Sequence, residues 1–225
     1  MTGAARSGGV AIFGGTFNPI HHGHLRSAVE LPEHLPVAGL RFMPCALPPH
    51  REPPGISARQ RAAMIELAIE GESRLSCDIR ELERSGLSYT IDSLCSLRQE
   101  IGPRRSLILV MGCDALLGLD HWHRWQELLQ HCHIVAIARP GWEWPTRGEL
   151  ADYLASRRVT AETLSQAPAG GVCTVSLRPL PISATEIRSL LQSGLSARYL
   201  VPDAVHTYIH QHSLYRQRGD DCQDK

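Results

Sequence analysis

The sequence lacks the features of a membrane protein, a secreted protein or a nucleic-acid-binding protein. Its longest apolar runs, such as Leu107–Met111 and Ile134–Ala138, are far too short to span a bilayer. The 225 residues contain 23 basic and 23 acidic side chains and no strongly basic block, so charge gives no support for binding DNA or RNA. The segment Met1–Gly9 lacks the long apolar core of a signal peptide. We therefore expect a cytoplasmic protein, monomeric or homo-oligomeric, with neither a membrane nor a nucleic acid as partner.

Several common catalytic and structural motifs are also missing. The seven cysteines are an odd number and form no C-x-x-C pair, which indicates reduced, partly buried thiols rather than a disulfide framework. The sequence contains no glycine-lysine phosphate loop, no G-x-G-x-x-G fingerprint and no G-x-S-x-G nucleophile motif. Any chemistry on phosphate groups must therefore come from a different arrangement of residues.

Short, wholly apolar runs alternate with helical patterns along the chain. The expected strands are Val10–Phe13, Leu40–Pro44, Leu75–Ile79, Leu107–Met111, Ile134–Ala138 and Val172–Leu177. The expected helices are His24–Leu31 (ended by Pro32), one opened by Ser57 with Gln60 in a capping box, Thr90–Ile101, Trp122–Leu129, one opened by Ser183 with Glu186, and Pro202–His210. Apolar strands between helices predict a Rossmann-like, doubly wound parallel sheet of the α/β class.

We expect this chain to form one domain. Residues 9–180 would make the α/β core, 181–215 a C-terminal helical part, and 216–225 a disordered tail. The Cys45–Gly55 segment is rich in proline and reads as a loop, and Pro140–Gly171 reads as a polar excursion whose role is open. Ligands of such sheets bind beyond the carboxyl ends of the strands, so the first strand–turn–helix is the place to look for chemistry.

The Gly14–His24 segment has the composition of a phosphate-binding loop. Its first two glycines allow backbone N–H groups to approach a ligand closely, and the helix that follows favours an anion at its N-terminus. His21 and His24 are three residues apart and so lie on one face of the first helical turn. Taken alone, these histidines could equally be exposed or capping residues, or part of a zinc site that lacks an evident fourth ligand.

A second loop-to-helix junction, Ile182–Arg188, has similar properties. Ser183 and Thr185 offer hydroxyl and N–H groups at the start of a helix, and Arg188 lies one turn further on, within reach of the same anion. The alternative is a capped surface helix that carries an unrelated arginine.

Together the two segments resemble signatures of the nucleotidyltransferase superfamily. Gly14–His24 resembles its H-x-G-H signature and the glycine-rich stretch before it, and Ile182–Arg188 resembles the motif that this superfamily uses on the β- and γ-phosphates of ATP. Further segments resemble bacterial nicotinate mononucleotide adenylyltransferases, so that the similarity runs from about Val10 to Tyr215: Pro48–Arg51, Ser88–Leu94, Met111–Asp114, His121–Trp125 and Ala138–Gly141. Taken singly, each segment could be a stiff loop, a helix cap or core; the ordered series favours the family.

The resemblance implies a nucleotidyltransferase fold and the transfer of AMP from ATP to nicotinate mononucleotide, which yields deamido-NAD and pyrophosphate in NAD biosynthesis. It implies catalytic roles for His24, His21 and Arg188. The implied ATP-binding residues are Gly14, Gly15, Thr16, Phe17, His21, His24, Gly112, Asp114, Ser183, Thr185 and Arg188. The implied residues for the second substrate are Asn18, His50, Arg51, Thr90, Trp122 and Arg139. The cofactor would be Mg²⁺ held mainly by the phosphates of ATP, with no metal ligand from the protein.

Small departures from the family pattern leave these roles intact. Asn18 stands where Asp is common, Ser93 where Thr is usual and Ala184 where many members carry Ser. The same chemistry with nicotinamide mononucleotide or phosphopantetheine is the nearest alternative function. The phosphopantetheine enzymes typically lack segments like Ser88–Thr90 and Trp122–Trp125. A non-catalytic nucleotide sensor is an alternative of another class, but a sensor should have lost a residue of the two phosphate motifs.

Overall fold

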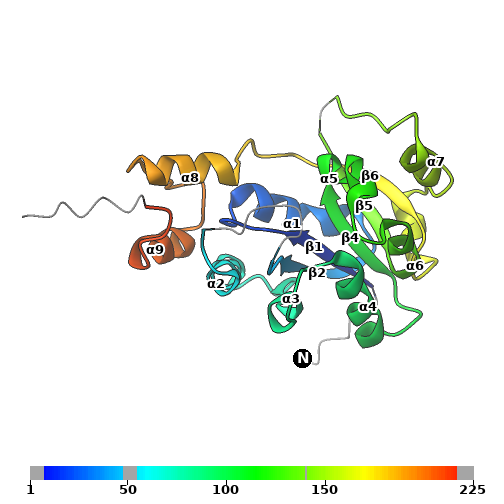
Figure 1. The fold of residues 1–225 in the computed structure, drawn as a ribbon, viewed down its shortest axis with the longest axis horizontal. Helices are drawn as coiled ribbons and strands as arrows, with labels where there is room; N and C mark the ends of the chain where they lie inside the picture. The colour runs from blue at the N-terminus through cyan, green and yellow to red at the C-terminus, as the bar shows by residue number, and fades with distance from the viewer. Residues whose placement is uncertain (1–7, 48–54, 140, 217–225) are drawn as a thin grey trace, which may run out of the picture.

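The fold is built on six parallel strands in the order β3-β2-β1-β4-β5-β6. The computed structural model describes residues 8–47, 55–139 and 141–216. The strands are β1 Gly9–Gly15, β2 Val37–Pro44, β3 Leu75–Cys77, β4 Leu107–Gly112, β5 His133–Ala138 and β6 Val172–Ser176. The chain reverses its direction across the sheet between β1 and β4, as a doubly wound sheet does (Figure 1). The predicted α/β, Rossmann-like fold is thereby confirmed.

Helices cover both faces of the sheet. They are α1 His22–His34, α2 Ala58–Ile69, α3 Arg80–Glu83, α4 Thr90–Ile101, α5 Cys113–Leu117, α6 Leu128–His131, α7 Glu149–Ala155, α8 Ala184–Gln192 and α9 Asp203–Gln211, with short 3₁₀ turns at Leu119–His121, Trp125–Glu127 and Ala161–Ser165. Figure 1 shows α8 and α9 at one end of the molecule and α7 at the other.

Successive residues of a strand pack into two separate hydrophobic cores, because side chains alternate between the two faces of a sheet. On β1, Ala11 packs into the core that contains Leu31 of α1, whereas Ile12 packs into the core that contains Leu94 of α4. The first core also receives apolar residues of α2, α8 and α9, and the second those of α5, α6 and α7. Strands that are apolar on both faces follow directly from this arrangement, as the sequence predicted.

Helix α1 does not end before Pro32, as we expected, but continues to His34. Leu31 and Leu35 lie on either side of this proline and are buried, with 0% and 4% of their surface exposed. The Leu35 N–H still reaches the Leu31 carbonyl oxygen at 3.0 Å. Packing of the two leucines therefore outweighs the one hydrogen bond that proline removes in the last turn.

The prediction of a helix over Trp122–Leu129 is wrong. Trp122 has an extended backbone (φ −82°, ψ 143°), and Arg124 adopts the left-handed conformation (φ 54°), which a continuous helix cannot contain. The Arg124 guanidinium donates to the Glu127 carboxylate at 2.8 and 2.6 Å and so closes a tight turn. Only Leu128–His131 is α-helical, as α6.

Other boundaries shift by a few residues. Strand β3 ends at Cys77, two residues earlier than predicted, and α9 runs from Asp203 to Gln211. The Ser57–Gln60 capping box is confirmed. At α8, the Glu186 N–H donates to the Ser183 hydroxyl at 3.1 Å, which is one of the two hydrogen bonds of the expected capping box. Within the described ranges, no helix has the length and apolar character needed to cross a membrane.

Candidate active site

The loop between β1 and α1 is held in a strained conformation by buried aromatic rings. Phe17 has φ 47°, a left-handed value that is uncommon for a bulky residue, and only 3% of its surface is exposed. Its ring packs edge-on against Phe42 at 5.4 Å and His24 at 5.1 Å between centroids. A Cβ atom on Gly15 would lie 2.9 Å from the Phe17 ring, so glycine is needed there. Such strain persists only where surrounding packing enforces it, often at functional sites.

His21 and His24 form a stacked pair at the start of α1, with ring centroids 3.7 Å apart. His21 is the N-cap residue, and Gly23 leaves room for it, because a Cβ there would lie 3.0 Å from the His21 ring. Burial is the main cause that lowers the pKa of His24 to about 3 and that of His21 to about 4. The charge of a neighbouring histidine is the second cause, from His21 in the first case and from His22 in the other. Both imidazoles are therefore neutral at pH 7 and act as hydrogen-bonding groups rather than as cations.

Each of these histidines has a buried Nδ1 atom with no hydrogen-bond partner among the described residues. A buried polar atom without a partner is costly, and such atoms often indicate a functional group. Both Nδ1 atoms are therefore free to form a hydrogen bond with a ligand.

The C-terminal segment meets this loop directly. The Arg188 guanidinium donates to the Asn18 carbonyl oxygen at 2.9 Å and to the Thr185 hydroxyl at 3.2 Å. The Tyr215 hydroxyl donates to the Asn18 side-chain oxygen at 2.6 Å. Ser183 caps α8 at the same junction. Two segments about 170 residues apart in sequence thus share one site, and their helices α1 and α8 both begin there.

A cavity of about 450 Å³ opens at the carboxyl ends of β1 and β4, which is the point where strand order reverses. Seven predicted site residues line it: Gly14, Gly15, Thr16, Thr90, Gly112, Asp114 and Trp122. Thr90 opens α4, and Gly112 is the N-cap of α5. This is the place and the size expected for a site that binds a small molecule.

Not every predicted residue reaches this cavity. The side chain of Phe17 is buried in the aromatic cluster, and Asn18 is held by Tyr215 and Arg188. Arg139 follows β5 and forms an ion pair with Asp114 at 2.8 Å, with 69% and 68% of the two side chains exposed. His50 and Arg51 lie outside the described residues.

Comparison with known proteins shows the family of the chain. Residues 12–190 match the family model described as cytidylyltransferase-like. A protein of Cellvibrio japonicus named "probable nicotinate-nucleotide adenylyltransferase" is 50% identical over 207 residues, which cover 92% of this chain and 98% of that protein. The protein with the same name from Pseudomonas aeruginosa is 49% identical, with 92% and 97% covered. The chain belongs to the nicotinate-nucleotide adenylyltransferase family.

Solved structures support the fold independently. The nicotinic acid mononucleotide adenylyltransferase of Plasmodium falciparum, solved as a complex with NaAD, superposes with a TM-score of 0.69 at 17% identity and covers 92% of this chain and 97% of its own. At such low identity the likeness concerns the fold alone. The chain is a nucleotidyltransferase with a Rossmann-like sheet, as the resemblance implied.

The roles of several groups at the site of this adenylyltransferase were not predicted from the sequence. The Glu81 carboxylate lines the cavity, is 5% exposed and accepts a bond from the Ser93 hydroxyl at 2.8 Å. The Ser88 hydroxyl accepts bonds from the Ala46 and Leu47 N–H groups at 3.1 and 3.2 Å, and so anchors the chain that leaves β2. No spacing pattern marks Glu81, because it lies on the four-residue helix α3.

One missed residue did leave a signal in the sequence. Arg61 lies on α2, three and four residues before Met64 and Ile65, which both have 0% exposure. A charged residue on the apolar face of a helix is rare unless it has specific partners. Arg61 proves to be completely buried, with 0% exposed.

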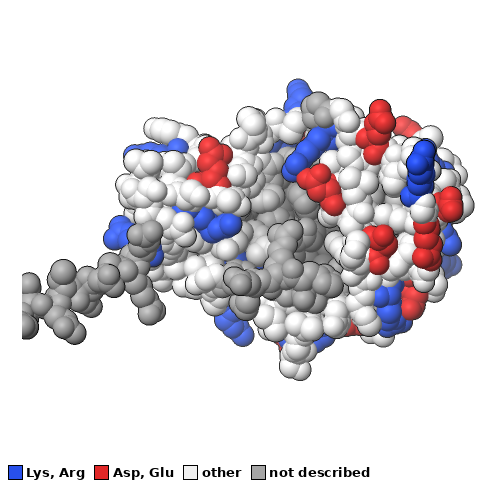
Figure 2. Space-filling model, turned by 45° about the horizontal axis from the view of Figure 1, so that its top comes forward, with Lys and Arg blue, Asp and Glu red and all other residues white. Residues whose placement is uncertain are grey.

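Charge on the outside of the adenylyltransferase follows no single sign. On the face drawn in Figure 2, acidic and basic side chains are interspersed. Within the described part of the chain, no group of three or more His, Cys, Asp or Glu side chains could hold a metal ion.

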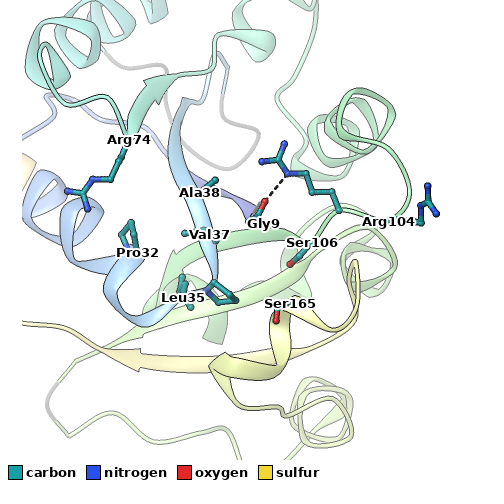
Figure 3. Close-up of a pocket in the computed structure, with 12 residues that line it drawn as sticks. Gly9, Pro32, Leu35, Val37, Ala38, Arg74, Arg104, Ser106 and Ser165 are labelled. Carbon is teal, nitrogen blue, oxygen red and sulfur yellow. Dashed lines mark hydrogen bonds between the residues drawn. The ribbon is translucent and has the colours of Figure 1, made fainter. Parts of the chain in front are cut away.

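A second hollow, of about 1150 Å³, lies at the amino ends of β1 and β2, beside Gly9 and Ala38. Figure 3 shows the side chains of Arg74 and Arg104 extending away from each other, so they do not converge on a ligand. Arg74 is also bonded to Glu72 at 3.0 Å. The cavity at the carboxyl ends of the strands is smaller, but it is the better candidate because it is more enclosed and seven predicted site residues line it. His21, His24, Ser183, Thr185 and Arg188 are not among the residues that line it.

Proposed function

We propose that the chain transfers AMP from ATP to nicotinate mononucleotide, with deamido-NAD and pyrophosphate as products in NAD biosynthesis. The observation that carries the proposal is the bond from Arg188 to the Asn18 carbonyl oxygen at 2.9 Å. It joins the two phosphate motifs at the start of α1, and the first of these motifs also supplies Gly14, Gly15 and Thr16 to the wall of the cavity. One extended ligand would therefore contact both motifs. The names of the sequence relatives agree with this reaction.

The reaction needs no nucleophile from the protein. The 5′-phosphate of the acceptor has a second pKa of about 6 and is largely ionised at pH 7, so no general base is needed. Burial raises the pKa of the Cys45 thiol to about 11, so this cavity-lining cysteine is not a thiolate. The work of the enzyme is to hold two anions in line and to stabilise the charge that develops.

The phosphate groups of ATP would lie between the two helix N-termini. Gly15 and Thr16 would offer backbone donors to the α-phosphate, and the neutral imidazoles of His21 and His24 would donate to the triphosphate. Arg188 would hold the leaving pyrophosphate with Ser183 and Thr185. Since both histidines are neutral before ATP arrives, arginine supplies the fixed positive charge.

The acceptor would occupy the cavity on the β4 side. Trp122 offers a ring for stacking on the pyridine, and Thr90 offers its hydroxyl and the first N–H groups of α4. Arg139 would close the rim above Asp114, and the ribose of ATP would meet Gly112 and Asp114. The roles of His50 and Arg51 toward the acceptor phosphate, and of Asn18, remain predictions from the resemblance.

A divalent cation, Mg²⁺ in our proposal, would enter with ATP. As the resemblance implies, phosphate oxygens and water would hold it. When bound, it neutralises phosphate charge as the two anions approach each other.

The decisive test measures pyrophosphate released from ATP with one acceptor at a time. We expect strong turnover with nicotinate mononucleotide and weak turnover with nicotinamide mononucleotide and phosphopantetheine. A preference for nicotinamide mononucleotide would overturn the substrate and keep the reaction. Absence of turnover with all three acceptors, in folded protein that binds ATP, would overturn the enzymatic function in favour of a nucleotide sensor.

A further inference from the structure

Arg61 is placed where its charge does not help the protein to fold. Its guanidinium is wholly buried beside apolar residues of α2, and burial lowers its pKa from the usual value. An arginine remains protonated in such a place, and a buried charge costs more than an apolar side chain of similar volume. Its Nε atom has no hydrogen-bond partner among the described residues. Core packing therefore does not explain why an arginine occupies this buried position.

The three hydrogen bonds recorded for Arg61 all go to backbone carbonyls of two separate loops. Nη1 donates to the Thr16 carbonyl oxygen at 2.6 Å, and Nη2 donates to the Cys45 and Ala46 carbonyl oxygens at 2.6 and 3.3 Å. No carboxylate lies within hydrogen-bonding distance of it among the described residues, although Glu81 is close enough to act on it through its charge. The planar fork of the guanidinium spans the two loops, which a single ammonium group cannot do.

Each of the two loops would bind a different substrate of the proposed reaction. Thr16 lies in the loop that would receive the phosphates of ATP, and it lines the cavity. Cys45 lines the same cavity and begins the segment that leads to Pro48–Arg51, which resembles the acceptor loop of the family. The Cys45 N–H also donates to the Gly15 carbonyl oxygen at 2.9 Å. Arg61 is thus a shared anchor beneath both loops.

We propose that Arg61 is a positioning residue that couples the two substrate loops, so that binding of one substrate tightens binding of the other. The inference rests on the proposed function. Because the guanidinium is bonded to both loops at once, a shift of the Cys45 loop on binding of the acceptor is passed to Thr16 through the same side chain. The second substrate then meets a loop that is already in its bound position, which gives positive cooperativity without direct contact between Arg61 and either ligand.

The test measures the dissociation constant of α,β-methylene-ATP by calorimetry, with and without saturating nicotinate mononucleotide. In the wild-type protein we expect the acceptor to tighten binding of the analogue at least about fivefold, the lower end of common coupling factors. Arg61→Lys keeps the charge and loses the bridge, so the factor should fall to within about twofold of one while each ligand alone still binds. Arg59→Lys, an exposed position on the same helix, is the matched control and should keep the wild-type factor.

Each outcome distinguishes a role of Arg61 in coupling the two substrates from a role in stabilising the fold alone. Arg61→Gln serves as the second variant, because its amide can keep a bond to one loop. A wild-type factor of one, a wild-type factor retained in Arg61→Lys, or failure of both variants to fold would overturn the proposal. Failure of the proposed function looks different, since the wild-type protein would then not bind nicotinate mononucleotide at all.

Discussion

Lowering the pH should destabilise this protein through the histidine pair at the start of α1. His21 has a pKa of about 4 in the folded state and an ordinary value of 6.5 when unfolded, so the unfolded chain binds more protons between these values. Stability conferred by the neutral imidazole is therefore present above pH 6.5 and is lost as the pH falls toward 4. From pH 7.5 to 5.0, the free energy of unfolding should fall by about 2 kcal/mol for His21 alone.

This magnitude depends little on the folded-state value. At pH 5.0 the unfolded histidine is almost fully protonated while the folded one is almost fully neutral, so any folded pKa of about 4 or below gives nearly the same loss. His24, with a pKa of about 3, should contribute a similar amount. Carboxylates also titrate in this range, but their contribution cancels when a variant is compared with the wild type.

The assay is urea unfolding at pH 7.5 and pH 5.0, followed by fluorescence of the four tryptophans. In His21→Asn, the loss of stability between the two pH values should be smaller than in the wild type by about 2 kcal/mol. Gln192→Asn, which replaces an exposed residue of α8 that does not titrate, is the control and should show the wild-type pH dependence. An identical pH dependence for His21→Asn and the wild type would refute the argument that burial keeps this imidazole neutral.

Three further predictions concern the reaction. His24→Ala should lower kcat roughly 10²–10³-fold, the scale for losing a donor to the transition state, while circular dichroism shows an intact fold; a near-normal kcat would remove His24 from the mechanism. Gly23→Ala should lower kcat without weakening the fold much, because the new Cβ would lie 3.0 Å from the His21 ring; steady-state kinetics with wild-type values would contradict this. Arg188→Lys should raise the Kd for ATP about tenfold or more, since a bidentate contact is lost, and calorimetry that shows unchanged affinity would exclude its phosphate role.

The sheet could be predicted because its strands are apolar on both faces. Runs such as Leu107–Met111 and Ile134–Ala138 admit few other structures when helical patterns separate them. Pro32 misled the prediction because a local rule about proline was weaker than the burial of the leucines beside it. The short helices α3, α5 and α7 left no usable periodicity, since four to seven residues complete at most two turns.

The candidate site was predictable where it is made of motif residues. Thr90, Gly112 and Trp122 line the same cavity although the sequence gives no information about their distance in space. Glu81 and Arg61 were missed for a physical reason. Their roles come from what they touch, a hydroxyl and three carbonyl groups brought together only by folding. The sequence pattern of α2 marks Arg61 as a charged residue on an apolar face, but it does not identify the carbonyl groups that Arg61 binds.

The bond from Tyr215 to Asn18 has a consequence for how the protein matures. The two residues are 197 positions apart, and Arg188 contacts the same loop from 170 positions away. At roughly 5–20 residues per second, ribosomes need about 10–40 s to synthesise the chain between them. Until residue 188 has been synthesised, the loop after β1 has neither of these partners, although β1 itself can already pair with β2. Nascent chains that stall before residue 188 would therefore carry most of the sheet and no completed phosphate site.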